Sequence, residues 1–300
     1  MINAQEKIDS SLIKQTCESL ERKRKKTLFL FVLYIVLASS VGAGGFAMLI
    51  TSLILEGIIR YILLPIGIVC FFLGGGGGSV LVLHTANSYS KEFFNRLVPL
   101  FGKSGYSSLS YSFKDKGDIA SFVSYPKAPK FDDDEACIYQ GFFKDGVSFL
   151  SYRYMKTKMG KGHPENVYGR YLEFLLPSTS QEEFLLTPKD KKNLFGSLGA
   201  SHQIRGESIL VERKYEALAS NETWGYKFFT PSIIELLSHY EEGTFSFLFK
   251  NNHLYISIDN YSSFYQCKLS RKVTIDNVLP LKKECELFAN IYSAFDQSLK

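Results

Sequence analysis

The chain has 300 residues, of which 45% are apolar and 22% are charged, and its formal net charge is +5. This length suits a membrane segment plus one soluble domain and leaves little room for two globular domains, which usually have about 100–200 residues each. A nucleic-acid-binding role is not favoured, because much of the positive charge lies in one short run rather than along a basic face.

Residues 1–26 form the first segment. Ile8, Leu12 and Leu20 lie near one helical face, so residues 1–20 are predicted to form an amphipathic helix. Such a helix could lie on the bilayer or on the soluble domain, and its weak apolar stripe favours neither. The segment ends in a basic run that acts as a topology signal and is also a candidate contact for anionic lipid: Arg22, Lys23, Arg24, Lys25 and Lys26.

Residues 27–83 are predicted to form a transmembrane hairpin. Crossing a hydrocarbon layer of about 30 Å takes about 20 apolar residues. Residues 28–49 and 61–83 are long enough and carry no charge, and the short connection between them contains Glu56 and Arg60 as its charged residues. Because this connection is too short for a domain, the two spans should place both chain ends on one side.

The basic flanks predict the orientation of the hairpin. A run of basic residues precedes the first span, Lys91 and Arg96 follow the second, and the connection has Arg60. Since Lys and Arg next to a span tend to stay cytoplasmic, we expect a multi-pass protein of the cell membrane with both termini cytoplasmic. A cleaved signal peptide is the alternative, and the long polar lead and continuing apolar sequence argue against it.

Consecutive glycines interrupt the second span: Gly74, Gly75, Gly76, Gly77 and Gly78. In water each glycine costs a helix about 1 kcal/mol relative to alanine, whereas in lipid small residues let helices pack closely. Ser40 and Gly44 offer a facing small-residue surface in the first span. We expect close packing within the hairpin or between subunits, with a hinge or pore lining as the alternative. A phosphate-binding loop is excluded because no Lys followed by Ser or Thr comes after the glycines.

Residues 84–300 are predicted to form a cytoplasmic α+β domain with a mainly antiparallel sheet and covering helices. A helix over residues 88–98 should leave the membrane, ending near Pro99 and Gly102. Lys144-Asp145-Gly146 and Asn251-Asn252 predict hairpin turns. Runs rich in Tyr, Phe, Val and Ile predict strands at residues 119–125, 136–143, 147–155, 170–176, 183–186, 208–213, 244–250, 254–259 and 263–269.

Two further helices are predicted in the C-terminal third. Thr230 is a cap residue before Pro231 at the first helical position, and an apolar face follows over residues 233–240. Between Leu281 and Phe295, apolar residues recur at steps of three and four. Both helices should cover one face of the sheet.

The chain resembles a bacterial two-pass membrane protein family of unknown function, domain of unknown function 3137. Residues 139–146, 226–231 and 247–258 carry the resemblance, which extends from the two spans through the soluble domain. Trp224-Gly225 and the glycine run depart from the family pattern. The resemblance implies topology and fold, and it implies no reaction, because the family has none assigned.

We find no catalytic, cofactor-binding or metal-binding pattern in the sequence. The histidines are scattered, the five cysteines form no Cys-x-x-Cys pair, and no nucleophile elbow is present, so no cofactor is expected. The run 132–135 contains four consecutive carboxylates, which cannot all point at one ion, so a solvated turn is favoured. Lys156, Lys158 and Lys161 lie in a basic, glycine-bearing segment and are the best candidates for contact with an anionic ligand or lipid headgroup.

Three functions remain open at this stage. The first is a non-enzymatic membrane protein whose cytoplasmic domain binds a protein or a small, anionic ligand, with membrane lipid and a second copy of the chain as further partners. The second is a ligand-gated effector or channel with the soluble domain as sensor. The third is an enzyme acting on lipid or nucleotide, which the absence of motifs does not favour.

Overall fold

A computed structural model describes residues 2–55, 57–102, 105–115, 135–159, 164–176, 181–189, 195, 198, 201–205, 209–228, 230–239, 243–259 and 267–299. It divides the chain into two compact units. The hairpin unit comprises Met1–Leu97 and Gln266–Val278, and the sheet unit comprises Val98–Tyr265 and Leu279–Lys300. Secondary structure of both types is present, so the chain is α+β, as predicted.

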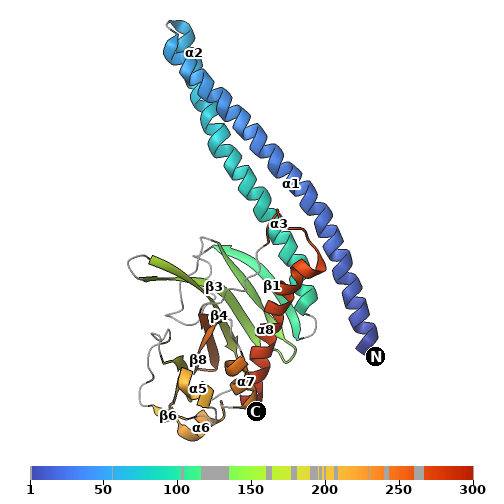
Figure 1. The fold of residues 1–300 in the computed structure, drawn as a ribbon, viewed down its shortest axis with the longest axis vertical. Coiled ribbons are helices and arrows are strands. Elements are labelled where there is room, and N and C mark those ends of the chain that lie inside the picture. The colour runs from blue at the N-terminus through green and yellow to red at the C-terminus, as the bar shows by residue number, and fades with distance from the viewer. Residues whose placement is uncertain are drawn as a thin grey trace. The chain divides into compact units, whose positions relative to one another are not determined.

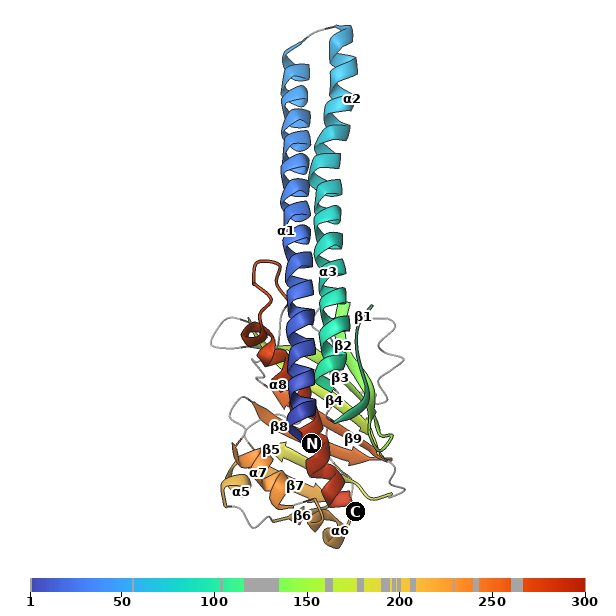
Figure 2. The ribbon, with the colours of Figure 1, turned by 90° about the vertical axis from the view of Figure 1, so that its right-hand side faces the viewer.

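The hairpin unit consists of two long antiparallel helical rods (Figures 1 and 2). The first rod is α1 (Ile2–Ile54), and the second is formed by α2 (Ile58–Phe72), a π-helical turn η1 (Leu73–Gly77) and α3 (Gly78–Phe101). The connection is shorter than predicted, because both helices extend to a turn at Gly57, whose φ of 83° suits glycine. In the described residues, Ser11–Ile54 and Ile58–Phe101 are long and apolar enough to cross a membrane.

The predicted amphipathic segment is continuous with α1 rather than a separate helix. Cys17 and Leu20 are buried. Ser19 accepts a hydrogen bond from Arg96 of α3 at 3.3 Å, and Lys23 forms an ion pair with Glu92 of α3. The end of this segment therefore packs against α3 within the hairpin unit.

The sheet unit contains a nine-stranded antiparallel sheet in the order β1-β2-β3-β4-β9-β8-β5-β7-β6, counted over the described residues. Its strands, in that order, are Tyr106–Asp115, Glu135–Phe143, Ser148–Met159, Pro164–Leu175, His253–Asp259, Thr244–Lys250, Phe184–Pro188, Tyr215–Ala219 and His202–Ile204. The predicted antiparallel sheet is confirmed, and β1, β6 and β7 are strands that the pattern of apolar residues did not indicate.

Two predicted hairpin turns are confirmed. Between β2 and β3, Gly146 has a φ of 88° and donates a backbone hydrogen bond to Phe143 at 3.0 Å. Between β8 and β9, Asn251 and Asn252 have φ values of 51° and 64°. A two-residue hairpin turn of this kind needs positive φ at both positions, and asparagine tolerates it better than most residues.

The predicted strand over residues 208–213 is wrong. Residues Ile209–Lys214 form a short helix, α5, and the strand begins directly after it as β7. A short apolar run such as Ile-Leu-Val fits either structure, and the charged Glu-Arg-Lys that follows extends the run as a helical turn. Of the strand predicted over 263–269, residues 267–269 are described and are not a strand, and the strand predicted over 119–125 lies outside the described residues.

Within the described residues, the remaining helices are α6 (Glu222–Tyr226), α7 (Pro231–His239) and α8 (Ile275–Leu299). Thr230 caps α7 as predicted, its hydroxyl accepting from the Ile233 amide at 3.4 Å. Aromatic side chains of α8 contact one sheet face, where Phe288 meets Tyr139 edge-on and Tyr292 stacks on Phe143 at 4.1 Å between ring centroids.

Candidate ligand-binding groove

Side chains of five neighbouring strands form two rows on the sheet face opposite α8. Because alternate residues of a strand share a face, residues paired across the strands line up in rows. The first row, from β1 to β9, is Ser108, Phe142, Ser148, Leu175 and His253. The second row is Ser110, Gln140, Leu150, Glu173 and Tyr255.

A groove of about 480 Å³ lies over these two rows. Every residue of the rows except Tyr255 lines it, together with Gly141 and Phe149. Small-molecule sites usually have about 300–1,000 Å³ and combine apolar walls with a few polar groups. The groove meets both descriptions, because Phe142 and Leu175 are about half exposed beside serine, glutamine, glutamate and histidine side chains.

Gly141 allows β1 to approach closely enough to form one end of the groove. A Cβ built on Gly141 would overlap the Ser108 carbonyl oxygen and lie 3.0 Å from its carbon. The pairing of β1 with β2 also shifts register between Tyr106 and Ser108. A strand that approaches this closely needs glycine opposite it, so Gly141 sets the position of Ser108 at the groove wall.

Glu173 and His253 form the ionisable part of the groove. Glu173 is 7% exposed, and one carboxylate oxygen lies 3.1 Å from His253 Nδ1. The other accepts a long hydrogen bond of 3.5 Å from the Tyr171 hydroxyl. The His253 ring is held by parallel stacking on Tyr255, with an interplanar angle of 4°. A buried carboxylate therefore faces the groove with its orientation fixed by two neighbours.

Neutral tyrosines surround the acidic groups beneath this face. Burial, then the charge of Asp259, raises the pKa of Tyr154 well above its ordinary value, and Tyr154 donates a hydrogen bond to Asp259. Burial, then the charge of Glu173, likewise raises the pKa of Tyr152. Both hydroxyls therefore stay protonated and are not poised to act as nucleophiles, and Tyr154 stabilises the Asp259 carboxylate as a donor.

The predicted small-residue contacts lie within the hairpin, with changed partners. A Cβ on Gly74 would lie 2.6 Å from the Ala38 carbonyl oxygen, and one on Gly78 would overlap the Ala38 side chain. By contrast, a Cβ on Gly44, Gly75, Gly76 or Gly77 would meet nothing within 4 Å among the described residues. Ser40 is exposed, and its hydroxyl donates to Val36 within the same helix. The surface of α1 that meets the glycines is therefore Ala38 and Gly42, which lie two residues before the predicted Ser40 and Gly44.

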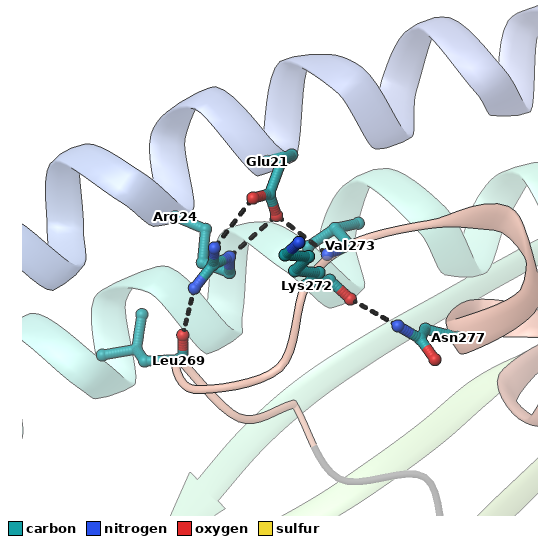
Figure 3. A network of polar contacts seen from close by, with 6 residues as sticks. All are labelled: Glu21, Arg24, Leu269, Lys272, Val273 and Asn277. Atoms are coloured by element: carbon teal, nitrogen blue, oxygen red, sulfur yellow. Dashed lines mark hydrogen bonds and ion pairs between the residues drawn. The ribbon is translucent and has the colours of Figure 1, made fainter.

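The basic run is divided between internal contacts and solvent. Arg22, Lys25 and Lys26 are exposed, whereas Arg24 is 6% exposed. Figure 3 shows Arg24 donating to Glu21 and to the Leu269 carbonyl, the latter at 2.6 Å. Glu21 also accepts from the Val273 amide at 2.8 Å. These bonds form a clasp that fastens residues 269–273 to α1.

The predicted anionic contact cannot be placed as a patch. Lys161 lies outside the described residues, and of Lys156 and Lys158 the backbone alone is described, within β3. Asp132 to Asp134 also lie outside the described residues. Among the residues described, no cluster of three or more His, Cys, Asp or Glu could hold a metal ion.

The sequence analysis missed the groove because its residues come from five strands and form no local motif. A signal is present in each strand alone: serine alternates with apolar residues at 108–112, and Glu173 alternates with Leu172 and Phe174. Such alternation indicates a polar sheet face. The residues that share one site on this face can be identified only when the strand order is known.

Comparisons of the chain with protein-family models, with curated proteins and with solved structures give no match.

Proposed function

We propose that this chain is a two-pass membrane protein whose sheet unit is a cytoplasmic, non-enzymatic receptor for a small molecule. The two long apolar helices support a membrane role, and the basic flanks of the spans support the orientation. The resemblance to the bacterial two-pass family is part of the same proposal and stays a prediction.

The groove is the observation that carries the receptor function. It combines a volume of about 480 Å³, half-exposed apolar side chains and one buried carboxylate on a rigid sheet. Sites built on strands hold their side chains more accurately than sites on loops. No nucleophile with an adjacent base was found in the sequence, so binding is favoured over catalysis.

Mass spectrometry of co-purified small molecules tests this proposal. Ser110→Tyr fills the exposed end of the groove, whereas Ser201→Tyr adds the same side chain at an exposed position outside the groove. A compound retained by the wild type and Ser201→Tyr should be lost from Ser110→Tyr. Equal retention by all three proteins would contradict binding in the groove.

The orientation is tested by protease accessibility in right-side-out spheroplasts. The sheet unit should be protected until the membrane is permeabilised, because the basic residues hold both termini inside. Cleavage of the sheet unit in intact spheroplasts would reverse the proposed topology.

A gated channel or effector is the second candidate, and the π-helical turn favours it. Leu73–Gly77 leaves the α-helical pattern inside a membrane span, and π turns occur often at functional positions. Gly75, Gly76 and Gly77 present bare backbone on this turn. Ligand-dependent conductance in reconstituted liposomes would support this candidate. Absence of conductance would contradict it and would favour a hairpin that serves as a membrane anchor.

A further inference from the structure

A second basic segment lies beside the basic run of α1. Residues 267–273 are held against α1 within the hairpin unit by the clasp at Glu21 and Arg24 (Figure 3). Both partners carry exposed basic residues, which we call the clasp surface: Arg22, Lys25 and Lys26 on α1, and Lys268, Arg271 and Lys272 on the segment. The fold therefore brings together two groups of positive charge that lie far apart in the sequence.

Exposed basic residues outnumber the exposed acidic residues around the clasp. Glu21 is engaged by the clasp itself, and Lys23 is paired with Glu92 of α3. Glu18 and Asp276 are exposed acidic residues next to the clasp surface in the sequence. Three basic residues on each partner exceed these two carboxylates, so the clasp surface keeps a net positive charge.

The clasp surface lies close to the start of the apolar part of α1. Lys26 is two residues before Leu28, the first residue of the predicted span. Arg24, which donates to the Leu269 carbonyl, is four residues before Leu28, or about 6 Å along the helix axis. Lys268 is the neighbour of Leu269 in the chain, so the segment adds its charge near the same level as the basic run.

This position and this charge favour the phosphates of anionic lipids as the partner. Clusters of about four to eight Lys and Arg directly beside a membrane span are typical of contacts with anionic headgroups. An anchored chain also holds such a cluster permanently at the headgroup level, where the effective concentration of lipid phosphate is high. A soluble polyanion would meet the same charges without this advantage.

We infer that the clasp surface binds the headgroup phosphates of anionic phospholipids in the bilayer that holds the hairpin. This lipid site rests on the proposed membrane role and adds a binding surface built from two distant parts of the chain. Its Lys and Arg side chains donate charge-assisted hydrogen bonds to phosphate oxygens. Glu21 and the buried Arg24 are positioning residues, because they hold residues 267–273 against α1.

Native mass spectrometry of the full chain in detergent tests the lipid site with a defined pair of lipids. Dioleoylphosphatidylglycerol and dioleoylphosphatidylcholine have the same acyl chains and differ in the net charge of the headgroup. From an equimolar mixture, the wild type should retain the glycerol lipid at least about tenfold over the choline lipid. This preference should shrink as the ammonium acetate concentration rises, because salt screens exposed charges.

A triple variant assigns the preference to the segment. It combines Lys268→Gln, Arg271→Gln and Lys272→Gln. Its matched control removes the same charge from exposed positions of the sheet unit by combining Lys189→Gln, Lys214→Gln and Lys227→Gln. The first triple variant should lower the preference for the glycerol lipid at least about fivefold, whereas the control should keep the wild-type preference.

A second pair of variants separates the site from net charge. Glu21→Ala removes the acceptor of Arg24 and of the Val273 amide, so the clasp is weakened while the chain becomes more positive. The preference for the glycerol lipid should fall at least about threefold in spite of the added charge. Glu18→Ala makes the same charge change at an exposed position of α1 and should keep or slightly raise the preference. Thermal unfolding checks that each variant is folded.

Three outcomes overturn the lipid site. They are equal retention of both lipids by the wild type, equal losses in the two triple variants, and displacement of the glycerol lipid by excess glycerol phosphate, which would assign the surface to a soluble anion. The proposed membrane role fails by a different result, namely extraction of the chain from membranes by alkaline carbonate. The receptor function fails separately, when Ser110→Tyr retains the same co-purified compounds as the wild type.

Discussion

Arg170 of β4 and Glu284 of α8 form an ion pair whose side chains are 3% and 1% exposed. Tyr139 donates to the same carboxylate at 3.1 Å, and the Arg170 guanidinium lies over the Tyr139 and Phe288 rings. Charged groups this deeply buried depend on one another, because each would otherwise stand in an apolar core without compensation.

Removing one member of the pair should cost more than removing both. Arg170→Met leaves the Glu284 carboxylate buried, so we expect a loss of about 3–5 kcal/mol in the free energy of unfolding. The double variant Arg170→Met with Glu284→Leu should lose much less. Denaturant unfolding of the full chain in detergent measures both, and an equal loss for the single and double variants would contradict mutual dependence.

Cys285 gives the sheet unit a measurable sensitivity to alkaline pH. Burial, opposed by the nearby Arg170 charge, raises the pKa of this thiol from 9.0 to about 12. An acid with a raised pKa keeps its proton in the folded state while the unfolded state loses it. Its contribution to stability is therefore fully present below about pH 9 and falls as pH rises toward about 12.

Cys285→Ala isolates this effect, because the variant retains every other titrating group. The stability advantage of the wild type over Cys285→Ala should shrink by about 1.4 kcal/mol for each pH unit above about 9. Denaturant unfolding at about pH 8 and about pH 10.5 checks the slope. A constant difference between the two proteins would show that the thiol is not held neutral in the folded state.

At the scale of elements, the glycines of the hairpin fall into two groups. Some lie against α1, and others have an open Cβ position. Gly78→Leu should force α1 and α3 apart, with a loss of about 1–3 kcal/mol, because the new side chain would meet Ala38. Gly76→Leu is the matched control, since its Cβ position is open. Thermal unfolding in detergent compares the two variants, and equal destabilisation would contradict the assigned contacts.

The same pair of variants distinguishes packing within one chain from packing between chains. If Gly76 faces a second copy in the membrane, Gly76→Leu should change the oligomer mass measured by light scattering while Gly78→Leu does not. An unchanged mass for Gly76→Leu would remove this position from any subunit interface.

Local patterns in the sequence were sufficient for much of the fold. The apolar stretches predicted the hairpin helices, and Asn251-Asn252 and Thr230-Pro231 predicted a turn and a helix start with the correct chemistry. Short elements were harder, because Ile209–Lys214 is apolar at its start and its state depends on neighbours. The groove required the strand order, since β4 pairs with β9, about 80 residues later in the sequence, and no local pattern encodes that pairing.

At the scale of the whole molecule, the basic patch remains a prediction. Replacing Lys156, Lys158 and Lys161 together with Gln should weaken binding of the full chain, in neutral-lipid nanodiscs, to anionic vesicles. The effect should diminish with salt, because exposed charges are screened over about 8 Å at physiological ionic strength. Lys227, Lys282 and Lys283 are exposed and provide a matched triple replacement with the same charge change. Equal loss for both triple variants would indicate net charge rather than a patch.

The clasp between α1 and residues 269–273 imposes an order on biosynthesis. Arg24 and the Leu269 carbonyl are 245 residues apart in the chain, and the intervening residues include the whole nine-stranded sheet. At about 5–20 residues per second, the ribosome takes about 10–50 s to supply the second partner. During this interval Arg24 has Glu21, one helical turn away, as a partner made at the same time. The hairpin helices therefore emerge first, and their clasp closes after the sheet has been synthesised.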